Sequence, residues 1–188
     1  MTLILWVLRL ILNTYYRFRK RGDVMDFIIE NMKEEDWLAV QIIHQEGIAT
    51  GNATFEVNAP DWDHWDKSHL TKCRLVAKVE ENVLGWVALS PVSNRCVYRG
   101  VAEVSLYVKE SSRGQGIGKM LLEAAIQGSE RISIWTLQSG TFPENTASIA
   151  LQKSCGFREV GTREKFGCMN NRWRDVILME RRSRIIGV

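Results

Sequence analysis

The chain has 188 residues, which is enough for one domain with a sizeable core. Hydrophobic residues make up 45% and charged residues 25%, so the composition indicates neither a disordered chain nor a fibrous repeat. The formal net charge of +3 suits an anionic ligand, but it is too small and too evenly spread to indicate nucleic-acid binding. We therefore expect a globular protein without a nucleic-acid partner.

The cysteines and histidines form no recognisable metal or disulfide pattern. They lie far apart and include no C-x-x-C pair: Cys73, Cys96, Cys155, Cys168, His44, His64 and His69. Since no zinc-ligand spacing is present, we expect no metal. Scattered, reduced thiols are typical of a cytoplasmic protein, and that is the predicted location.

Residues 1–24 differ from the pattern that follows them. An apolar run at 3–12 precedes a basic cluster made of Arg17, Arg19, Lys20 and Arg21. The run is too short to span a bilayer, which takes about 20 residues, and a secretory signal would carry its positive charges before the apolar part. An interfacial helix that tethers the protein to a membrane is one interpretation. We favour an extension outside the fold, with a domain at 25–188 and no stable membrane insertion.

From residue 25 onward the sequence predicts one continuous α/β domain. Its first half is expected to contain a strand at 27–31, a helix after Lys33–Asp36, a break at 51–54, a short helix after Pro60, and strands at 75–79 and 83–89. Its second half is expected to contain a strand at 101–108, a glycine-rich loop at 111–119, a helix at 120–126, a strand at 132–137, a helix at 145–154 capped by Gly156, and strands at 157–161 and 173–179.

The strand at 101–108 has two different faces. Glu103, Ser105 and Tyr107 alternate with residues that are all apolar. Polar groups on a strand in the middle of the domain indicate that this face is directed into a cleft.

The loop after this strand has the pattern R-G-x-G-x-G at Arg113–Gly118 and opens a helix. Its glycines allow several N–H groups to point one way, and the helix dipole adds positive potential, so the loop suits a phosphate or pyrophosphate. A Walker loop needs one more residue between its glycines, followed by Ser or Thr after the lysine. A Rossmann fingerprint needs a later third glycine and a position in the first β-α unit. Taken alone, the loop could also be a glycine-rich turn without a ligand.

Other segments accompany this loop in a fixed order. They are Asn52–Glu56, Tyr98–Ser105, Tyr107–Val108, Arg113–Lys119, Trp135–Ser139, Phe142–Asn145 with Ala147–Ile149, Gly156–Phe157, Trp173–Asp175 and Glu180–Ser183. Over about residues 25–183 the chain resembles the GNAT superfamily of N-acetyltransferases, and within it the phosphinothricin and methionine sulfoximine acetyltransferases. The resemblance implies an α/β fold with a mixed, mostly antiparallel sheet that splays at the cofactor site and is flanked by helices.

The resemblance also implies acetyl-CoA as co-substrate and assigns its contacts. The predicted cofactor-binding residues are Leu106, Tyr107 and Val108, through their backbone; Arg113, Gly114, Gln115, Gly116, Ile117, Gly118 and Lys119, at the pyrophosphate; and Asn145 and Ser148. The acceptor would be the amino group of a small, amino-acid-like molecule. Members of the family commonly dimerise, so a homodimer is an expectation.

Glu103 is the predicted general base. An amino group is mostly protonated at neutral pH, so a proton must leave before the amine attacks the thioester. We expect burial to make this carboxylate a better base. The structural alternative is that Glu103 only forms an ion pair with Arg99 or another cation. No tyrosine is placed as the general acid, and that role stays unassigned.

The acceptor contacts are predicted by the resemblance and by residue type. Phe55 and Glu56 lie where the family closes over its acceptor, and Arg95 and Arg99 could hold a carboxylate or phosphinate. Arg163 and Lys165 are further candidates for that role, although most surface cations are simply solvated. Trp62 and Trp65 could line the acceptor pocket or pack in the core.

Other functions remain open at this point. One is a GNAT enzyme that acetylates a peptide N-terminus or a polyamine. Another is a non-catalytic module that binds acetyl-CoA as a sensor. We favour a small acceptor, because the aromatic residues of the 54–65 stretch are suited to covering a small molecule.

Overall fold

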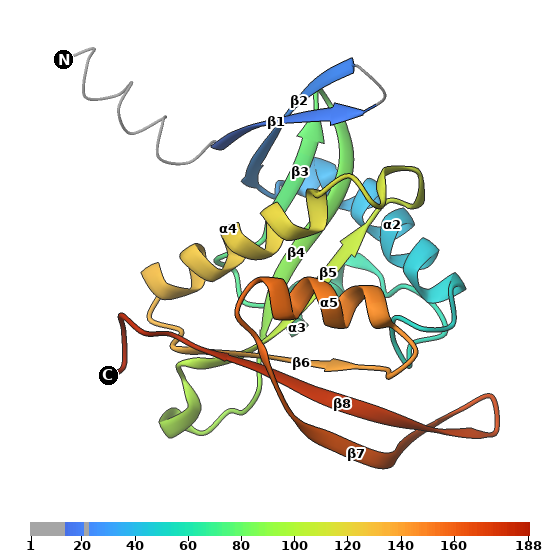
Figure 1. The fold of residues 1–188 in the computed structure, drawn as a ribbon, viewed down its shortest axis with the longest axis vertical. Helices are drawn as coiled ribbons and strands as arrows, with labels where there is room; N and C mark the ends of the chain where they lie inside the picture. The colour runs from blue at the N-terminus through green and yellow to red at the C-terminus, as the bar shows by residue number, and fades with distance from the viewer. Residues whose placement is uncertain (1–13, 21–22) are drawn as a thin grey trace.

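The computed structural model describes residues 14–20 and 23–188, which form one sheet flanked by helices (Figure 1). The strands are β1 (Thr14–Lys20), β2 (Asp23–Asn31), β3 (Leu75–Val79), β4 (Asn82–Pro91), β5 (Val101–Val108), β6 (Thr136–Thr141), β7 (Arg158–Met169) and β8 (Arg172–Arg182). The α-helices are α2 (Trp37–Ala49), α3 (Trp62–Ser68), α4 (Ile117–Arg131) and α5 (Thr146–Ser154). The strand order is β1-β2-β3-β4-β5-β6-β8-β7, and only β5 and β6 pair in parallel. The predicted mixed, mostly antiparallel sheet is confirmed.

The two faces of the sheet carry separate cores. Val87 and Leu89 of β4 pack in the cluster that includes α4, whereas Trp86 and Ala88 pack in the cluster that includes α2 and Trp65 of α3. Successive side chains of a strand point to opposite faces, so α2 and α3 cover one face and α4 covers the other. Helix α5 lies beside α4 (Figure 1).

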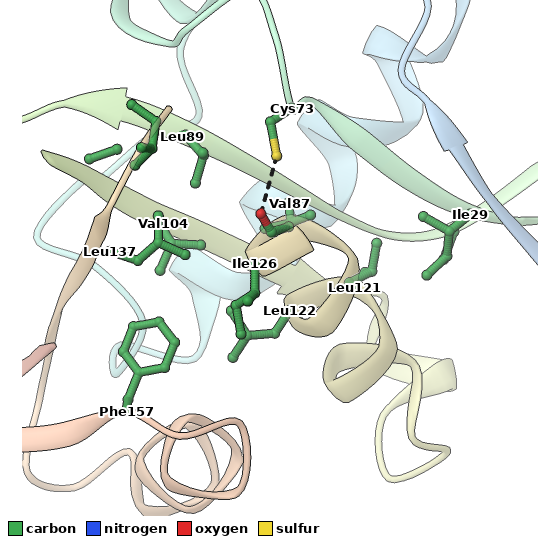
Figure 2. Packing of buried hydrophobic residues seen from close by; sticks show 14 of the residues in the cluster. Ile29, Cys73, Val87, Leu89, Val104, Leu121, Leu122, Ile126, Leu137 and Phe157 are labelled. Atoms are coloured by element: carbon green, nitrogen blue, oxygen red, sulfur yellow. Dashed lines mark hydrogen bonds between the residues drawn. The ribbon is translucent and has the colours of Figure 1, made fainter. Parts of the chain in front are cut away.

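The core under α4 is closely packed. Figure 2 shows Leu121, Leu122 and Ile126 of this helix among apolar side chains of the sheet. The thiol of Cys73 donates a hydrogen bond to the carbonyl oxygen of Ala125 at 3.5 Å, drawn as the dashed line in Figure 2. Burial raises the pKa of the Cys73 thiol to about 12, so this cysteine is a neutral core residue.

The sheet forks between its two parallel strands. Strand β5 pairs with β4 over its whole length, from Ala102 to Val108. It pairs with β6 only at its beginning, and the last matched position joins Glu103 to Gln138. Residues 104–108 therefore have no strand partner on the β6 side. This is the splay that the resemblance predicted.

The N-terminal boundary differs from the expectation. Strand β1 pairs with β2 from Thr14 opposite Ile29 to Lys20 opposite Asp23. A boundary at residue 24 thus falls inside this hairpin, because residues 14–20 supply the edge strand of the sheet. The apolar run at 3–12 lies outside the described residues, and its place outside the fold stays a prediction.

Two later strands also differ from their predicted bounds. The chain makes a turn after α4, where the amides of Ile132 and Ile134 both donate to the carbonyl of Ser129, and Ser133 has a φ of 64°. The strand expected at 132–137 therefore begins later, as β6. Strand β7 continues past the predicted end at residue 161, because it pairs with β8 in a long hairpin (lower edge of Figure 1).

Candidate active site

A cavity of about 360 Å³ lies where β5 and β6 separate. It is lined by residues from β5, β6, α5, β7 and β8, and by the loop after α2. Of the predicted site residues, those on the cavity wall are Phe55, Glu103, Leu106, Tyr107, Asn145, Ser148 and Arg163. The fork in the sheet thus brings together the proposed base, part of the proposed cofactor strand and one side of the proposed acceptor site.

Glu103 is exposed and lies at the last paired position before the fork. The side-chain amide of Gln138, its neighbour across the two strands, donates to its carboxylate at 3.3 Å. The expected burial of Glu103 is therefore wrong, since the carboxylate faces an open cavity. The alternative ion pair with Arg99 or another cation is not formed among the described residues; the Arg99 guanidinium instead lies 6.0 Å from the ring centroid of Trp135.

Loop 113–119 turns the chain from β5 into α4. Gly116 is the N-cap of α4 and has a φ of 80°, a conformation that glycine adopts without strain. The loop is braced locally, because Arg113 Nε donates to the Val108 carbonyl at 3.2 Å and Gln115 Nε2 donates to the Ser111 carbonyl at 3.1 Å. The first N–H groups of a helix have no partner within the helix, so this end is suited to an anion.

The start of α4 lies close to β5 and α5. A Cβ atom at Gly118 would be 3.2 Å from Leu151 Cδ2 and 3.5 Å from Val108 Cγ2, which explains why a residue without a side chain stands there. Loop 113–119 itself does not line the cavity. Its position after the open strand places a helix start suited to an anion next to the free edge of β5.

Helix α5 presents two of the proposed cofactor contacts. Asn145 caps the helix, with its side-chain oxygen accepting from the Ser148 amide at 3.2 Å. The buried Gln152 donates to the hydroxyl oxygens of Ser148 and Thr141, at 3.1 and 2.9 Å. This network fixes the α5 wall of the cavity.

Loop 51–56 forms another part of the wall, through residues 53–55. The Phe55 ring meets the Phe142 ring edge-on at 4.7 Å between centroids and lies directly over the backbone of Gly167. Glu56 is not on the cavity wall; its carboxylate lies 2.9 Å from Nε2 of the buried His44.

Tyr107 contributes its side chain as well as its backbone. Its ring stacks on Trp86 at 4.9 Å and contacts His44 at 4.5 Å. Burial, together with the nearby Glu56 carboxylate, raises the pKa of the Tyr107 hydroxyl, although a hydrogen bond with Thr54 partly offsets this. The phenol is therefore neutral across the physiological range.

The candidate acceptor cations are separated by the fold. Arg95 lies over the ring of Tyr98 and Arg99 over that of Trp135, and neither is on the cavity wall. Arg163 is on the wall, with its guanidinium 4.9 Å from the centroid of Phe166. Of the described residues that line the cavity, it is the only arginine or lysine.

The remaining candidates do not reach the cavity. The Lys165 amide donates to the Asp175 carboxylate at 2.7 Å in the β7–β8 hairpin. Trp65 is fully buried and stacks with Trp62, and both contact Trp37, so these indoles form part of the α2-side packing. For Trp62 and Trp65 the packing interpretation holds.

Sequence reasoning missed several wall residues, namely Gln138, Ser139, Thr141, Phe142 and Phe166. A usable signal existed for Gln138, since a strand parallel to β5 had to place some residue opposite Glu103. Ser139 and Thr141 belong to β6, which extends beyond the strand predicted at 132–137, and Phe142 follows it directly. Phe166 lies on β7 beyond the end that the sequence predicted for that strand.

Within residues 14–20 and 23–188, no helix has the length and apolar character that a membrane span requires. The same residues hold no group of three His, Cys, Asp or Glu side chains placed to bind a metal ion. The expected homodimer and cytoplasmic location stay predictions.

A forked α/β sheet with a glycine-rich helix start after its open strand is the arrangement expected of an acyl-CoA-dependent N-acyltransferase. Residues 37–157 match the acetyltransferase (GNAT) family. The phosphinothricin N-acetyltransferase of Alcaligenes faecalis is 30% identical over 161 residues, which are 80% of this chain and 79% of that protein. The L-methionine sulfoximine/L-methionine sulfone acetyltransferase of Pseudomonas paraeruginosa is 32% identical over 83 residues, 44% of this chain and 48% of that protein.

A solved structure shows the same fold. The GNAT superfamily phosphinothricin acetyltransferase from Sinorhizobium meliloti, crystallised with acetyl-CoA, has a TM-score of 0.75 and 27% sequence identity, and the match covers 82% of this chain and 86% of that one. The chain belongs to the GNAT family of acetyltransferases and is an N-acetyltransferase.

Proposed function

We propose that this enzyme transfers the acetyl group of acetyl-CoA to the amino group of a small, amino-acid-like substrate of the phosphinothricin or methionine sulfoximine type. The relatives named for these two substrates support the acceptor class. The volume of the cavity, about 360 Å³, suits an amino acid together with the acetyl end of the co-substrate.

The chain offers a matching site for acetyl-CoA. The open edge of β5 at Leu106–Val108 can pair with the pantetheine arm as an added strand would. Loop 113–119 supplies N–H groups and the positive end of α4 for the pyrophosphate. Asn145 and Ser148 complete the contacts from the α5 side.

The observation that carries the proposal is the place of Glu103 at the fork. Its carboxylate faces the cavity beside the open edge of β5, where the thioester would lie. Glu103 accepts a proton from the substrate ammonium, directly or through a water. The amine nitrogen then forms a bond to the thioester carbonyl carbon, and the carbon–sulfur bond breaks. The nitrogen gives up its second proton to solvent, and CoA leaves as a thiolate that takes up a proton from solvent.

Arg163 is the proposed partner of the substrate carboxylate or phosphinate. It shares the cavity wall with Glu103, so one substrate could place its amine at the carboxylate and its acid group at the guanidinium. Arg95 and Arg99 lie outside this wall, and we therefore prefer Arg163 to them.

A thiol-release assay with acetyl-CoA tests the function. The acceptor panel is phosphinothricin, methionine sulfoximine, methionine sulfone, the common L-amino acids, a peptide with a free N-terminus and a polyamine. We expect turnover of phosphinothricin, methionine sulfoximine or methionine sulfone. Glu103→Gln should lower kcat by about 10²- to 10⁴-fold, the usual contribution of a general base, and leave CoA binding intact.

The matched control is Glu159→Gln, which removes an exposed carboxylate outside the cavity and should retain activity. Turnover of the peptide or the polyamine alone would reject the acceptor class. CoA binding without turnover of any acceptor would favour the sensor function.

A further inference from the structure

Arg174 of β8 is a buried cation outside the cavity wall. Its exposed fraction is 9%, and its guanidinium makes three hydrogen bonds. Nη1 donates to the Gly51 carbonyl at 2.9 Å, and Nη2 donates to the side-chain oxygen of Asn52 at 3.0 Å and to the Glu144 carboxylate at 3.1 Å. Such a charge is stable in the interior only because these acceptors compensate for its lost hydration.

These contacts join two segments that serve different parts of the site. Gly51 and Asn52 begin loop 51–56, which continues into the cavity wall at Phe55. Glu144 belongs to turn 142–145, which ends at Asn145, one of the proposed cofactor contacts. Arg174 therefore connects the acceptor wall to the cofactor wall from behind the cavity.

Two further contacts run parallel to this connection. The Asn145 side-chain amide donates to the Asn52 carbonyl at 3.2 Å, and the Phe142 and Phe55 rings meet edge-on. The Arg174 guanidinium lies over Phe142, 4.0 Å from the ring centroid. Hydrogen bonds from its own backbone and from Arg174 lower the pKa of Glu144, so the carboxylate stays ionised near neutral pH.

We propose that Arg174 is a positioning residue that couples the two binding sites: CoA fixes turn 142–145, and Arg174 passes this restraint to loop 51–56. The inference rests on the proposed function only for the contact of Asn145 and Ser148 with the co-substrate. Coupling of this kind is reciprocal, so an acceptor that orders loop 51–56 also tightens CoA binding.

Hydrogen exchange of the full chain, with and without CoA, tests the coupling without any acceptor. In the wild type, CoA should slow exchange of the amides in loops 113–119 and 51–56. In Arg174→Met, CoA should still protect loop 113–119 but should no longer protect loop 51–56. Arg174→Lys retains the charge with fewer donors, so its protection of loop 51–56 should lie between that of the wild type and that of Arg174→Met. Arg158→Met is the control, because it removes an exposed cation, paired with Glu180 at 2.6 Å, from the same hairpin.

Unchanged protection of α4 in the absence of CoA would show that each variant is folded. If Arg174→Met keeps CoA-dependent protection of loop 51–56, the coupling through Arg174 is rejected while the proposed function stands. If CoA protects only loop 113–119 in the wild type, the coupling is likewise rejected and the proposed function stands. Protection of neither loop by CoA in the wild type would overturn both.

A second measurement uses an acceptor that the enzyme turns over. The dissociation constant of CoA is measured without and with that acceptor. In the wild type, the ratio of the first value to the second should be at least about five, the lower end of typical coupling. In Arg174→Met the ratio should approach one. An equal ratio in both proteins would show that Arg174 has a structural role and does not couple the two binding sites.

Discussion

We assign loop 113–119 to the cofactor and loop 51–56 to the acceptor, and the hydrogen bonds that hold the two loops differ in their range along the sequence. The side chains that brace loop 113–119 bond to carbonyls four and five residues away in the sequence. Loop 51–56 has short-range bonds too, since the Glu56 amide donates to the Thr54 hydroxyl at 3.1 Å. It is also held by Asn145 and Arg174, whose bonds to it span 93 to 123 positions. The side-chain bracing of loop 113–119 is therefore local in sequence. The acceptor loop depends on the completed fold, so acceptor preference can change while the cofactor site stays the same.

Replacing a left-handed glycine in each loop tests this separation. Gly116 in loop 113–119 has a φ of 80°, and a Cβ there would meet only Met120 Cε at 4.0 Å, so Gly116→Ala changes backbone preference without crowding. A non-glycine residue costs roughly 1–2 kcal/mol in this conformation, equivalent to about 5- to 30-fold. We expect the KM for acetyl-CoA to rise within that range in steady-state assays, with the acceptor KM unchanged.

Gly51 gives the matched variant in the other loop. Its φ is 68° and a Cβ would meet nothing within 4 Å, so Gly51→Ala carries the same backbone cost. Here the acceptor KM should rise while that of acetyl-CoA changes less. If both variants raised both KM values equally, the two loops would not contribute separately to cofactor and acceptor binding, and the proposed separation would be wrong.

The sequence predicted the elements that depend on local patterns better than those that depend on contacts between distant segments. The alternating residues of β5, the glycines before α4 and the glycine that follows α5, Gly156, are local signals, and each gave the correct element. The bounds of β6 were placed too early, because the turn around Ser133 interrupts an apolar run that looks like a strand.

The acceptor side could not be read in this way. Arginines at 95, 99, 163 and 174 look alike in the sequence, and the fold gives them different surroundings. Arg163 lies on the cavity wall beside an irregularity in the β7–β8 pairing, between Arg163 and Gly167. No local sequence pattern predicts this irregularity. Arg174 is buried only because loops distant in sequence supply its acceptors.

Substitution of Arg163 is expected to have a smaller effect than Gly116→Ala. The guanidinium is exposed, and such charge pairs contribute up to about 1 kcal/mol, or about five-fold. Arg163→Gln should raise the KM of methionine sulfone by about that factor but leave the KM of its carboxamide unchanged. Arg158→Gln serves as a control on the same hairpin. An equal rise for the acid and the amide would rule out Arg163 as the carboxylate partner, and a rise with Arg95→Gln would return that role to Arg95.

The smallest expected effect concerns the aromatic packing on the α2 side of the sheet. His69 stacks on Trp65 at 4.3 Å, and burial lowers its pKa below the ordinary 6.5. The positive charges of Arg74 and His44 lower it further, while the hydrogen bond with the Trp65 carbonyl and the Glu56 carboxylate oppose the shift. Below about pH 6.5 the unfolded chain therefore binds more protons than the folded one. The stability linked to His69 is complete above that pH and declines as the pH falls toward the folded-state pKa.

Thermal unfolding between pH 7.5 and 5.5 measures this loss. The melting temperature of the wild type should fall by a few degrees over the range, and His69→Gln, which cannot titrate, should flatten the curve. His64→Gln provides the comparison, because it makes the same substitution at an exposed histidine of α3. A wild-type curve no steeper than that of His69→Gln would mean that the imidazole gains a proton as readily in the folded chain as in the unfolded one. In that case His69 and the aromatic side chains packed around it would be open to solvent in the folded chain.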